Sequence, residues 1–147
     1  MDKNPTLLLV EDSDEDFQLL VLACRRAALP VSVQWVKSAE QGLAYLRGED
    51  RFKDRIHFPF PYLVLIDLNL PGSSGFEVLK WIRQQPELSD LMVWVYSNSL
   101  EARDATIAYQ LDANSYVVKP RDLKQWADFI RTLEISTQPY LRVTEHA

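Results

Sequence analysis

The feature that most constrains this sequence is a run of four branched apolar residues that ends abruptly on a carboxylate. Leu63–Ile66 reads LVLI, and Asp67 follows it directly. A short, unbroken apolar run of this kind is typical of a parallel strand that is buried on both faces. Residues 71–75, PGSSG, predict a loop before the next helical pattern. Open α/β sheets bind their ligands at the carboxyl ends of such strands, so Asp67 is the first candidate site residue.

A strand followed by a helix is the pattern of the whole chain, and it occurs five times. Apolar runs predict strands over residues 7–10, 31–36, 63–66, 91–96 and 115–118, and the alternation within 31–36 indicates an edge strand. Apolar residues at helical spacing follow each run, the last of them over 123–133. Ser13 or Asp14, and Ser38, are suited to cap the first two helices. Five such units predict an α/β fold, a doubly wound, flavodoxin-like sheet of five parallel strands in the order 2-1-3-4-5.

Two segments fall outside this pattern. Residues 47–61, RGEDRFKDRIHFPFP, are charged and then aromatic, and we interpret them as a helix extension plus a loop inserted before the third strand. Phe52, Phe58 and Phe60 within it either cover the sheet or form a partner surface. Residues 134–147 are interpreted as a C-terminal tail, so that residues 1–133 form one domain and no output domain follows.

Composition narrows the classes of protein to which the chain can belong. Its 147 residues are 47% hydrophobic, which suits one globular domain with a sizeable core. The net charge of −5 argues against a nucleic-acid-binding surface, which would be basic. The single cysteine, Cys24, cannot form an internal disulfide, and neither a signal peptide nor an apolar run of membrane length is present. We therefore expect a cytoplasmic domain that binds no membrane.

Polar functional residues follow four of the five predicted strands. They are Glu11 and Asp12, Asp67, Ser97 and Lys119. Because the carboxyl ends of parallel strands share one edge of the sheet, three carboxylates, a hydroxyl and an ammonium should converge there. Clustered carboxylates repel one another unless a cation compensates them, and Mg²⁺ prefers such oxygen ligands. A metal, a lysine and a hydroxyl around a carboxylate favour phosphoryl transfer to that carboxylate.

These residues resemble the receiver domain of two-component response regulators, over nearly the whole chain from about Leu7 to Leu133. Ser97, Tyr116 and Lys119 follow Asp67 by 30, 49 and 52 positions, which are the offsets of that family. The resemblance implies that Asp67 is the phosphoacceptor and that Lys119 and Ser97 contact the phosphoryl group. It implies three further features: a metal site of Glu11, Asp12, Asp67 and the backbone carbonyl of Asn69, a conformational switch at Ser97 and Tyr116, and a cis peptide bond between Lys119 and Pro120.

A narrower resemblance is to the stand-alone regulators that partner bacterial phytochrome-type histidine kinases. It rests on LLVEDS at residues 8–13, DLNLP at residues 67–71 and the extra segment 47–61. It implies a single-domain response regulator, not an enzyme with a separate substrate, that receives its phosphoryl group from a histidine kinase or phosphotransfer protein. Output would run through the face formed by residues 102–111, 115–118 and 123–133, to a protein partner or to a second copy in a homodimer.

Three positions depart from the family pattern. Ser74 stands where an aspartate is usual, at or near a helix N-terminus, and Asp112 stands where a glycine is common. Asn98 replaces a small residue beside Ser97, and we expect its side chain to narrow access to Asp67. None of these changes removes a chemical group of the site, so we expect an active receiver.

Other interpretations of the same residues remain open. A flavodoxin-like cofactor binder would need a phosphate-binding loop where this chain has EDSDED, and a haloacid-dehalogenase-type phosphatase would need an acid at Asn69. A degenerate receiver that only binds partners is the third alternative. Within the acidic run 11–16 only Glu11 and Asp12 are assigned to the metal, and the later acids to the helix N-terminus. Cys24, Trp94 and Tyr96 are interpreted as core residues, and His57 as structural.

Overall fold

A five-stranded parallel sheet forms the centre of the computed structural model, which describes residues 4–145. Its strands are β1 (Thr6–Val10), β2 (Ser32–Val36), β3 (Leu63–Ile66), β4 (Met92–Ser97) and β5 (Ser115–Val118). They lie in the order β2-β1-β3-β4-β5, and every neighbouring pair is parallel. The predicted strand order and fold class are therefore confirmed.

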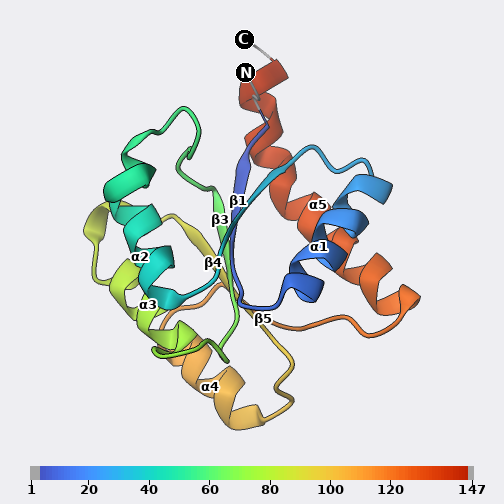
Figure 1. The fold of residues 1–147 in the computed structure, drawn as a ribbon. Helices are drawn as coiled ribbons and strands as arrows, with labels where there is room; N and C mark the ends of the chain where they lie inside the picture. The colour runs from blue at the N-terminus through green and yellow to red at the C-terminus, as the bar shows by residue number, and fades with distance from the viewer. Residues whose placement is uncertain (1–3, 146–147) are drawn as a thin grey trace.

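Helices cover both faces of this sheet. They are α1 (Asp14–Arg26), α2 (Ala39–Arg47), α3 (Gly75–Arg83), α4 (Ala102–Gln110) and α5 (Leu123–Glu145), with short 3-10 helices η1 (Asp50–Lys53) and η2 (Pro86–Leu88). In Figure 1, α1 and α5 lie on one side of the sheet and α2, α3 and α4 on the other. None of the helices over the described residues is both long and apolar enough to cross a membrane.

The sheet has a hydrophobic core on each face, as strands buried on both sides require. Leu8 and Val64 belong to the core under α2 and α3, whereas Leu7 and Leu63 belong to the core under α1 and α5. All residues of β1 and β3 are buried, but those of β2 before Val36 are only half-buried. The prediction that β2 is an edge strand is confirmed, and Trp94 and Tyr96 lie in the core as expected.

Local backbone requirements explain where the helices begin. Ser13, Ser38 and Ser74 are the N-caps of α1, α2 and α3, and each side chain accepts a backbone N–H from the first turn. Gly75 starts α3 directly against the end of β3, because a Cβ there would lie 2.2 Å from the backbone oxygen of Asp67. Asp112 has a φ of +66°, the left-handed conformation that Asp tolerates better than most residues.

The inserted segment 47–61 differs from the predicted helix extension. Helix α2 ends at Arg47, since Gly48 adopts a left-handed φ of +68°, and η1 forms a separate turn. Phe52 is buried and Phe58 packs beside it at a ring-centroid distance of 5.1 Å, so these two rings cover the core. Phe60 is exposed.

The prediction that residues 134–147 form a tail is wrong for the part that the structure describes. Helix α5 continues without interruption to Glu145, through Pro139, and only residues 146–147 of that tail lie outside the described range. Thr137 is fully buried, and its Oγ1 lies 2.5 Å from the hydroxyl of Tyr62. The ring of Tyr140 lies 4.7 Å from that of Tyr62, so these side chains continue the packing of α5 beyond Leu133.

Candidate functional site

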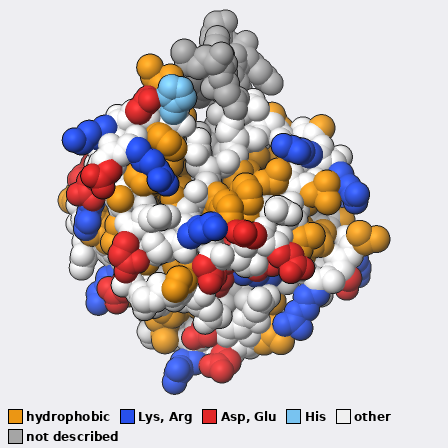
Figure 2. Space-filling view, in the orientation of Figure 1, with side chains coloured by type: hydrophobic (Ala, Val, Ile, Leu, Met, Phe, Trp, Pro, Cys, Tyr) orange, Lys and Arg blue, Asp and Glu red, His pale blue; other side chains and the backbone are white. Residues whose placement is uncertain are grey.

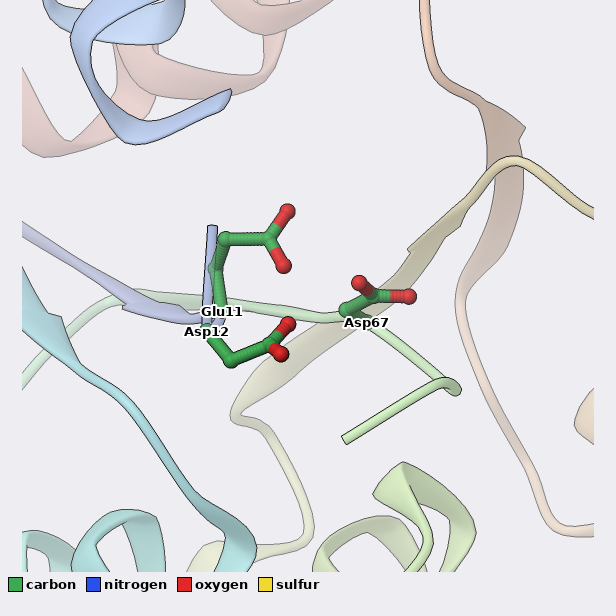
Figure 3. A group of neighbouring side chains, drawn as sticks. All are labelled: Glu11, Asp12 and Asp67. Carbon is green, nitrogen blue, oxygen red and sulfur yellow. The ribbon is translucent and has the colours of Figure 1, made fainter. Parts of the chain in front are cut away.

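The predicted site residues converge at the carboxyl edge of the sheet. Glu11, Asp67, Ser97 and Lys119 are all buried there, at the ends of β1, β3, β4 and β5, whereas Asp12 and Asn69 are exposed. Carboxylate oxygens of Glu11, Asp12 and Asp67 lie within 4.8 Å of one another. Figure 3 shows the three carboxylates, two from the end of β1 and one from the end of β3. Acidic side chains also gather near the middle of the face drawn in Figure 2.

Lys119 is the counter-charge of this cluster. Its Nζ donates to Glu11 Oε1, to Asp16 Oδ2 at 2.7 Å and to Asp67 Oδ2 at 3.0 Å. Burial alone would lower the pKa of Lys119, but the hydrogen bonds to Asp16 and Glu11 and the charge of Asp67 outweigh it and raise the pKa. The side chain is therefore an ammonium held among three carboxylates.

Asp16 is the residue of this network that the sequence did not reveal. The acidic run predicts a place for Asp16 at the N-terminus of a helix, and Asp16 does lie in the first turn of α1. Its side chain also reaches Lys119, 103 positions away along the chain. No local pattern marks a contact over that distance.

The environment of Glu11 fits a cation. Burial, a hydrogen bond with Asp67 and the charge of Asp67 together raise its pKa to about 8, against the opposing effect of Lys119. Its Oε2 is buried and has no hydrogen-bond partner among the described residues. A buried carboxylate oxygen without a partner is costly, and a divalent cation that accepts oxygen ligands satisfies it. The described residues therefore form an acidic pocket suited to such an ion.

The loop after β3 begins on a turn that Asp67 itself stabilises. The backbone N–H of Asn69 donates to Asp67 Oδ1 at 3.1 Å, and Asn69 is exposed. Further along, Ser73 Oγ donates to Glu40 Oε1 at 2.7 Å, which ties the loop to α2. The role of the Asn69 carbonyl as a metal ligand remains a prediction.

Ser97 and Tyr116 are linked through Ser99. The backbone N–H of Ser99 donates to Ser97 Oγ at 3.2 Å, and the hydroxyl of Tyr116 donates to the Ser99 carbonyl at 2.9 Å. Ser99 Oγ donates in turn to Asp104 Oδ2 of α4 at 2.6 Å. The loop between β4 and α4 thus connects the end of the site to the tyrosine on β5. Asn98, within this loop, is exposed.

The predicted cis peptide bond before Pro120 is wrong, because the structure has no cis peptide bond among the described residues. The trans form is the lower in energy even for a bond that precedes proline. In this conformation the Lys119 N–H donates to the Ser97 carbonyl at 2.9 Å, and Nζ still reaches the acids. Neither contact requires the cis isomer.

Comparison with known proteins identifies the family. A family model described as "Response regulator receiver domain" matches residues 7–131. The chain belongs to the response regulator receiver family. Receiver domains are signalling proteins, and the cofactor-binder and phosphatase alternatives are thereby set aside.

The receiver is similar over most of its length to regulators whose names refer to red light or phytochromes. The response regulator RPA3017 in red light signaling of R. palustris is 37% identical, with a TM-score of 0.82, over 88% of this chain and 90% of that one. The phosphorylated cyanobacterial phytochrome response regulator RcpA is 32% identical, with a TM-score of 0.81, over 92% and 94%.

A third relative was solved with a metal. Response regulator Rcp1 of Synechocystis is 31% identical over 90% of each chain. The Mn²⁺-bound structure of Rcp1 has a TM-score of 0.77 over 88% of this chain and 91% of that one. In this chain, Glu11, Asp12 and Asp67 form an acidic cluster whose carboxylate oxygens lie within 4.8 Å of one another.

Proposed function

We propose that this receiver accepts a phosphoryl group on Asp67 from a histidine kinase, or from a phosphotransfer protein, and signals through a change of its surface. The observation that carries the proposal is the position of Lys119. Its Nζ lies 3.0 Å from the buried Asp67 Oδ2, beside an acidic pocket that fits a divalent cation. Similarity to red-light and phytochrome regulators supports a phytochrome-type kinase as the donor.

In the proposed transfer, a carboxylate oxygen of Asp67 forms a bond to phosphorus while the bond from phosphorus to the donor's histidine nitrogen breaks. The electron pair of the broken bond stays on that nitrogen. Lys119 remains protonated and neutralises charge on the phosphoryl oxygens. In the proposed dephosphorylation that ends the signal, water attacks phosphorus, inorganic phosphate leaves and the carboxylate of Asp67 is restored.

The residues that would hold Mg²⁺ are Glu11, Asp12 and Asp67 through their carboxylates, and Asn69 through its backbone carbonyl. When bound, the cation would supply positive charge to the phosphoryl oxygens as the bond to phosphorus is exchanged. Two observations support this assignment: the buried, unpartnered Oε2 of Glu11 and the spacing of the three carboxylates within 4.8 Å.

The proposed output uses the connection between Ser97 and Tyr116. A phosphoryl group on Asp67 brings new acceptor oxygens, and the Ser97 hydroxyl moves to donate to one of them. Ser99 then shifts with Ser97, because its N–H is bonded to Ser97 Oγ, and the Tyr116 hydroxyl that donates to the Ser99 carbonyl is repositioned. The surface of α4, β5 and α5 changes its population of conformers, and a protein partner or a second copy recognises it.

A groove between α1 and α5 supports a protein as the phosphodonor. Its volume is about 530 Å³, and apolar side chains, among them Leu19, Leu22 and Leu123, form most of its wall. Arg121, two positions beyond Lys119, lies at its end. We propose that a helix of the donor protein packs here, which brings its phosphohistidine to the edge of the sheet. Leu22→Glu should then slow transfer from the donor but leave labelling by acetyl phosphate unchanged.

The chemistry is tested by intact mass after incubation with Mg²⁺ and acetyl phosphate. We expect the gain of one phosphoryl group, which is lost in Asp67→Asn and on removal of the metal. Labelling that persists in Asp67→Asn would contradict the assignment of the acceptor. If wild type labels slowly, Asn98→Ala should accelerate it, because Asn98 is expected to narrow access to Asp67. If neither wild type nor Asn98→Ala is labelled while metal is bound, the phosphoacceptor role of Asp67 is contradicted.

The output is tested separately from the chemistry. Lys119→Ala should separate phosphorylation from the surface change, so unaltered partner binding by phosphorylated Lys119→Ala would argue against the switch. Sedimentation at several protein concentrations, with and without phosphorylation, tests the homodimer. A monomer at every concentration in both states would remove it.

A further inference from the structure

Trp35 on the edge strand β2 reaches across to the residue that begins the acidic pocket. Its indole Nε1 donates to the backbone carbonyl of Glu11 at 2.6 Å. The N–H of Glu11 donates to the carbonyl of Val36, the next residue of β2, at 3.0 Å. The backbone N–H and carbonyl of Glu11 are therefore both hydrogen-bonded to consecutive residues of β2: the N–H to the backbone of Val36, and the carbonyl to the side chain of Trp35.

The indole is itself held in place from two elements. The ring of Phe17 on α1 stacks on it at a centroid distance of 4.2 Å and an interplanar angle of 8°. Lys37 Nζ lies 4.8 Å from the indole centroid and also pairs with Asp14 Oδ1 at 3.2 Å. A ring fixed in this way presents its N–H in one direction, so the bond to Glu11 is preorganised.

The Glu11 carbonyl belongs to the peptide unit that joins Glu11 to Asp12. A net change of the backbone torsions on either side of this unit would redirect the side chain of Asp12 relative to those of Glu11 and Asp67. Asp12 is exposed, so the direction of its carboxylate depends on the backbone that carries it. On the other side, the N–H of Asp67 donates to the Val10 carbonyl at 3.0 Å and fixes β3 against the same stretch of β1.

We propose that Trp35 is a positioning residue for the cation site: its indole N–H, by holding the Glu11–Asp12 peptide, keeps both carboxylates directed at Asp67. This inference rests on the proposed function, in which these acids bind a divalent cation. Loss of a group that orients metal ligands without touching the metal typically weakens metal binding by about 10- to 100-fold. Trp35 acts here on the backbone between two ligands.

The test is a Mg²⁺ titration of the full chain by isothermal calorimetry. Trp35→Phe keeps an aromatic ring to stack on Phe17 and removes only the N–H donor. We expect it to weaken Mg²⁺ binding about tenfold. The matched control is Trp126→Phe, the same chemical change in a half-buried ring that packs against Phe129 on α5. The control should bind within about twofold of wild type.

A readout in metal-free protein separates positioning from simple destabilisation. The Trp35 indole N–H should exchange with solvent at least about tenfold more slowly than that of free tryptophan, as measured by NMR. In Trp35→Phe the backbone N–H of Asp12 should exchange faster or shift, while the amides of α5 keep their wild-type rates. An indole that exchanges freely would overturn the proposal.

The outcomes distinguish this inference from the proposed function. Wild-type protein that fails to bind Mg²⁺ would overturn the cation site itself. Wild type that binds Mg²⁺ while folded Trp35→Phe binds equally well would overturn only the role of Trp35. Weaker binding confined to Trp35→Phe, with Trp126→Phe unchanged, supports it.

Discussion

The hydroxyl pair of Tyr62 and Thr137 provides the sharpest test of how helix α5 is anchored beyond Leu133. Thr137 Oγ1 donates to the Leu133 carbonyl at 2.7 Å, so the Tyr62 hydroxyl, 2.5 Å away, must be the donor to Thr137. Both residues are buried, and burial raises the pKa of Tyr62 to about 12, which keeps its proton in place at neutral pH. The pair therefore forms a directed chain from the start of β3 to α5.

Two substitutions should have unequal costs because they leave different groups unsatisfied. Thr137→Val removes the acceptor and leaves the Tyr62 hydroxyl buried without a partner, which should lower the free energy of unfolding by about 2 kcal/mol. Tyr62→Phe removes the donor but leaves Thr137 bonded to Leu133, so about 1 kcal/mol should be lost. The double variant leaves neither hydroxyl without a partner and should lose about 1 kcal/mol. The two single losses sum to about 3 kcal/mol, so the effects should be non-additive by about 2 kcal/mol.

Urea unfolding followed by circular dichroism measures these differences. Thr132→Val is the matched control, because Thr132 is an exposed threonine of the same helix whose hydroxyl also donates to a carbonyl one turn back, that of Asp128. It should change stability by less than about 0.5 kcal/mol. If Thr137→Val costs no more than Thr132→Val, or if the two single effects simply add, the end of α5 is not anchored as described.

Three further predictions follow from the titratable groups. Lys119→Met leaves the buried carboxylate of Asp67 without its counter-charge, so the metal-free protein should lose about 3 kcal/mol of unfolding free energy, partly restored by Mg²⁺. A loss below about 1 kcal/mol in urea unfolding would contradict this. Because the pKa of Glu11 is raised to about 8, Mg²⁺ must displace a proton from Glu11 below that pH, and its affinity should fall up to about tenfold for each pH unit below about 8. Calorimetry that finds no proton release on Mg²⁺ binding near about pH 6.5 would contradict this prediction. Burial raises the pKa of Cys24 to about 11, so a thiol reagent at pH 8 should label it only after urea is added, and rapid labelling of native protein would refute the buried position.

The same pKa shift of Glu11 affects folding in a defined direction. A carboxyl whose pKa is higher in the folded than in the unfolded protein favours folding while it holds its proton. This contribution is fully present below the unfolded value, near 4.5, and is lost as the pH rises through about 8. Metal-free protein should therefore become less stable across this range, and the cation should oppose the loss.

The sheet and the clustering of Glu11, Asp12 and Asp67 could be predicted from the sequence because both depend on local signals. Apolar runs such as Leu63–Ile66 mark strands, and a polar residue directly after each run is placed at the same edge by parallel topology alone. The contact between Asp16 and Lys119 could not be predicted in this way, since it depends on how α1 is rotated against the sheet. The indole bond from Trp35 to Glu11 is of the same kind, because the alternation of β2 says only that Trp35 is half-buried.

The end of α5 was missed for a different reason. Between Leu133 and Leu141 the buried position is Thr137, and the half-buried Tyr140 packs against Tyr62; both Thr137 and Tyr140 carry a hydroxyl, and Pro139 interrupts the helical pattern. Their packing is favourable because Tyr62, directly before β3, bonds Thr137 through its hydroxyl and contacts Tyr140 through its ring. Pro139 is exposed, and the helix continues through it because tertiary packing of this kind outweighs a local penalty of about 3 kcal/mol.

Under the proposed function, phosphorylation would break existing contacts of Lys119 as well as form new ones. Lys119 is shared among Glu11, Asp16 and Asp67, so no carboxylate has it alone. Under that function, a phosphoryl group on Asp67 would carry about −1.5 to −2 charges in place of the single charge of the carboxylate, and it would compete for the same ammonium. Lys119 would then turn towards the phosphoryl oxygens, its hydrogen bond to Asp16 would weaken, and α1 would lose this contact with the end of β5. Under the proposed function, the signal would thus reach α1 through Lys119 as well as α4 and β5 through Ser97, from a single event at Asp67.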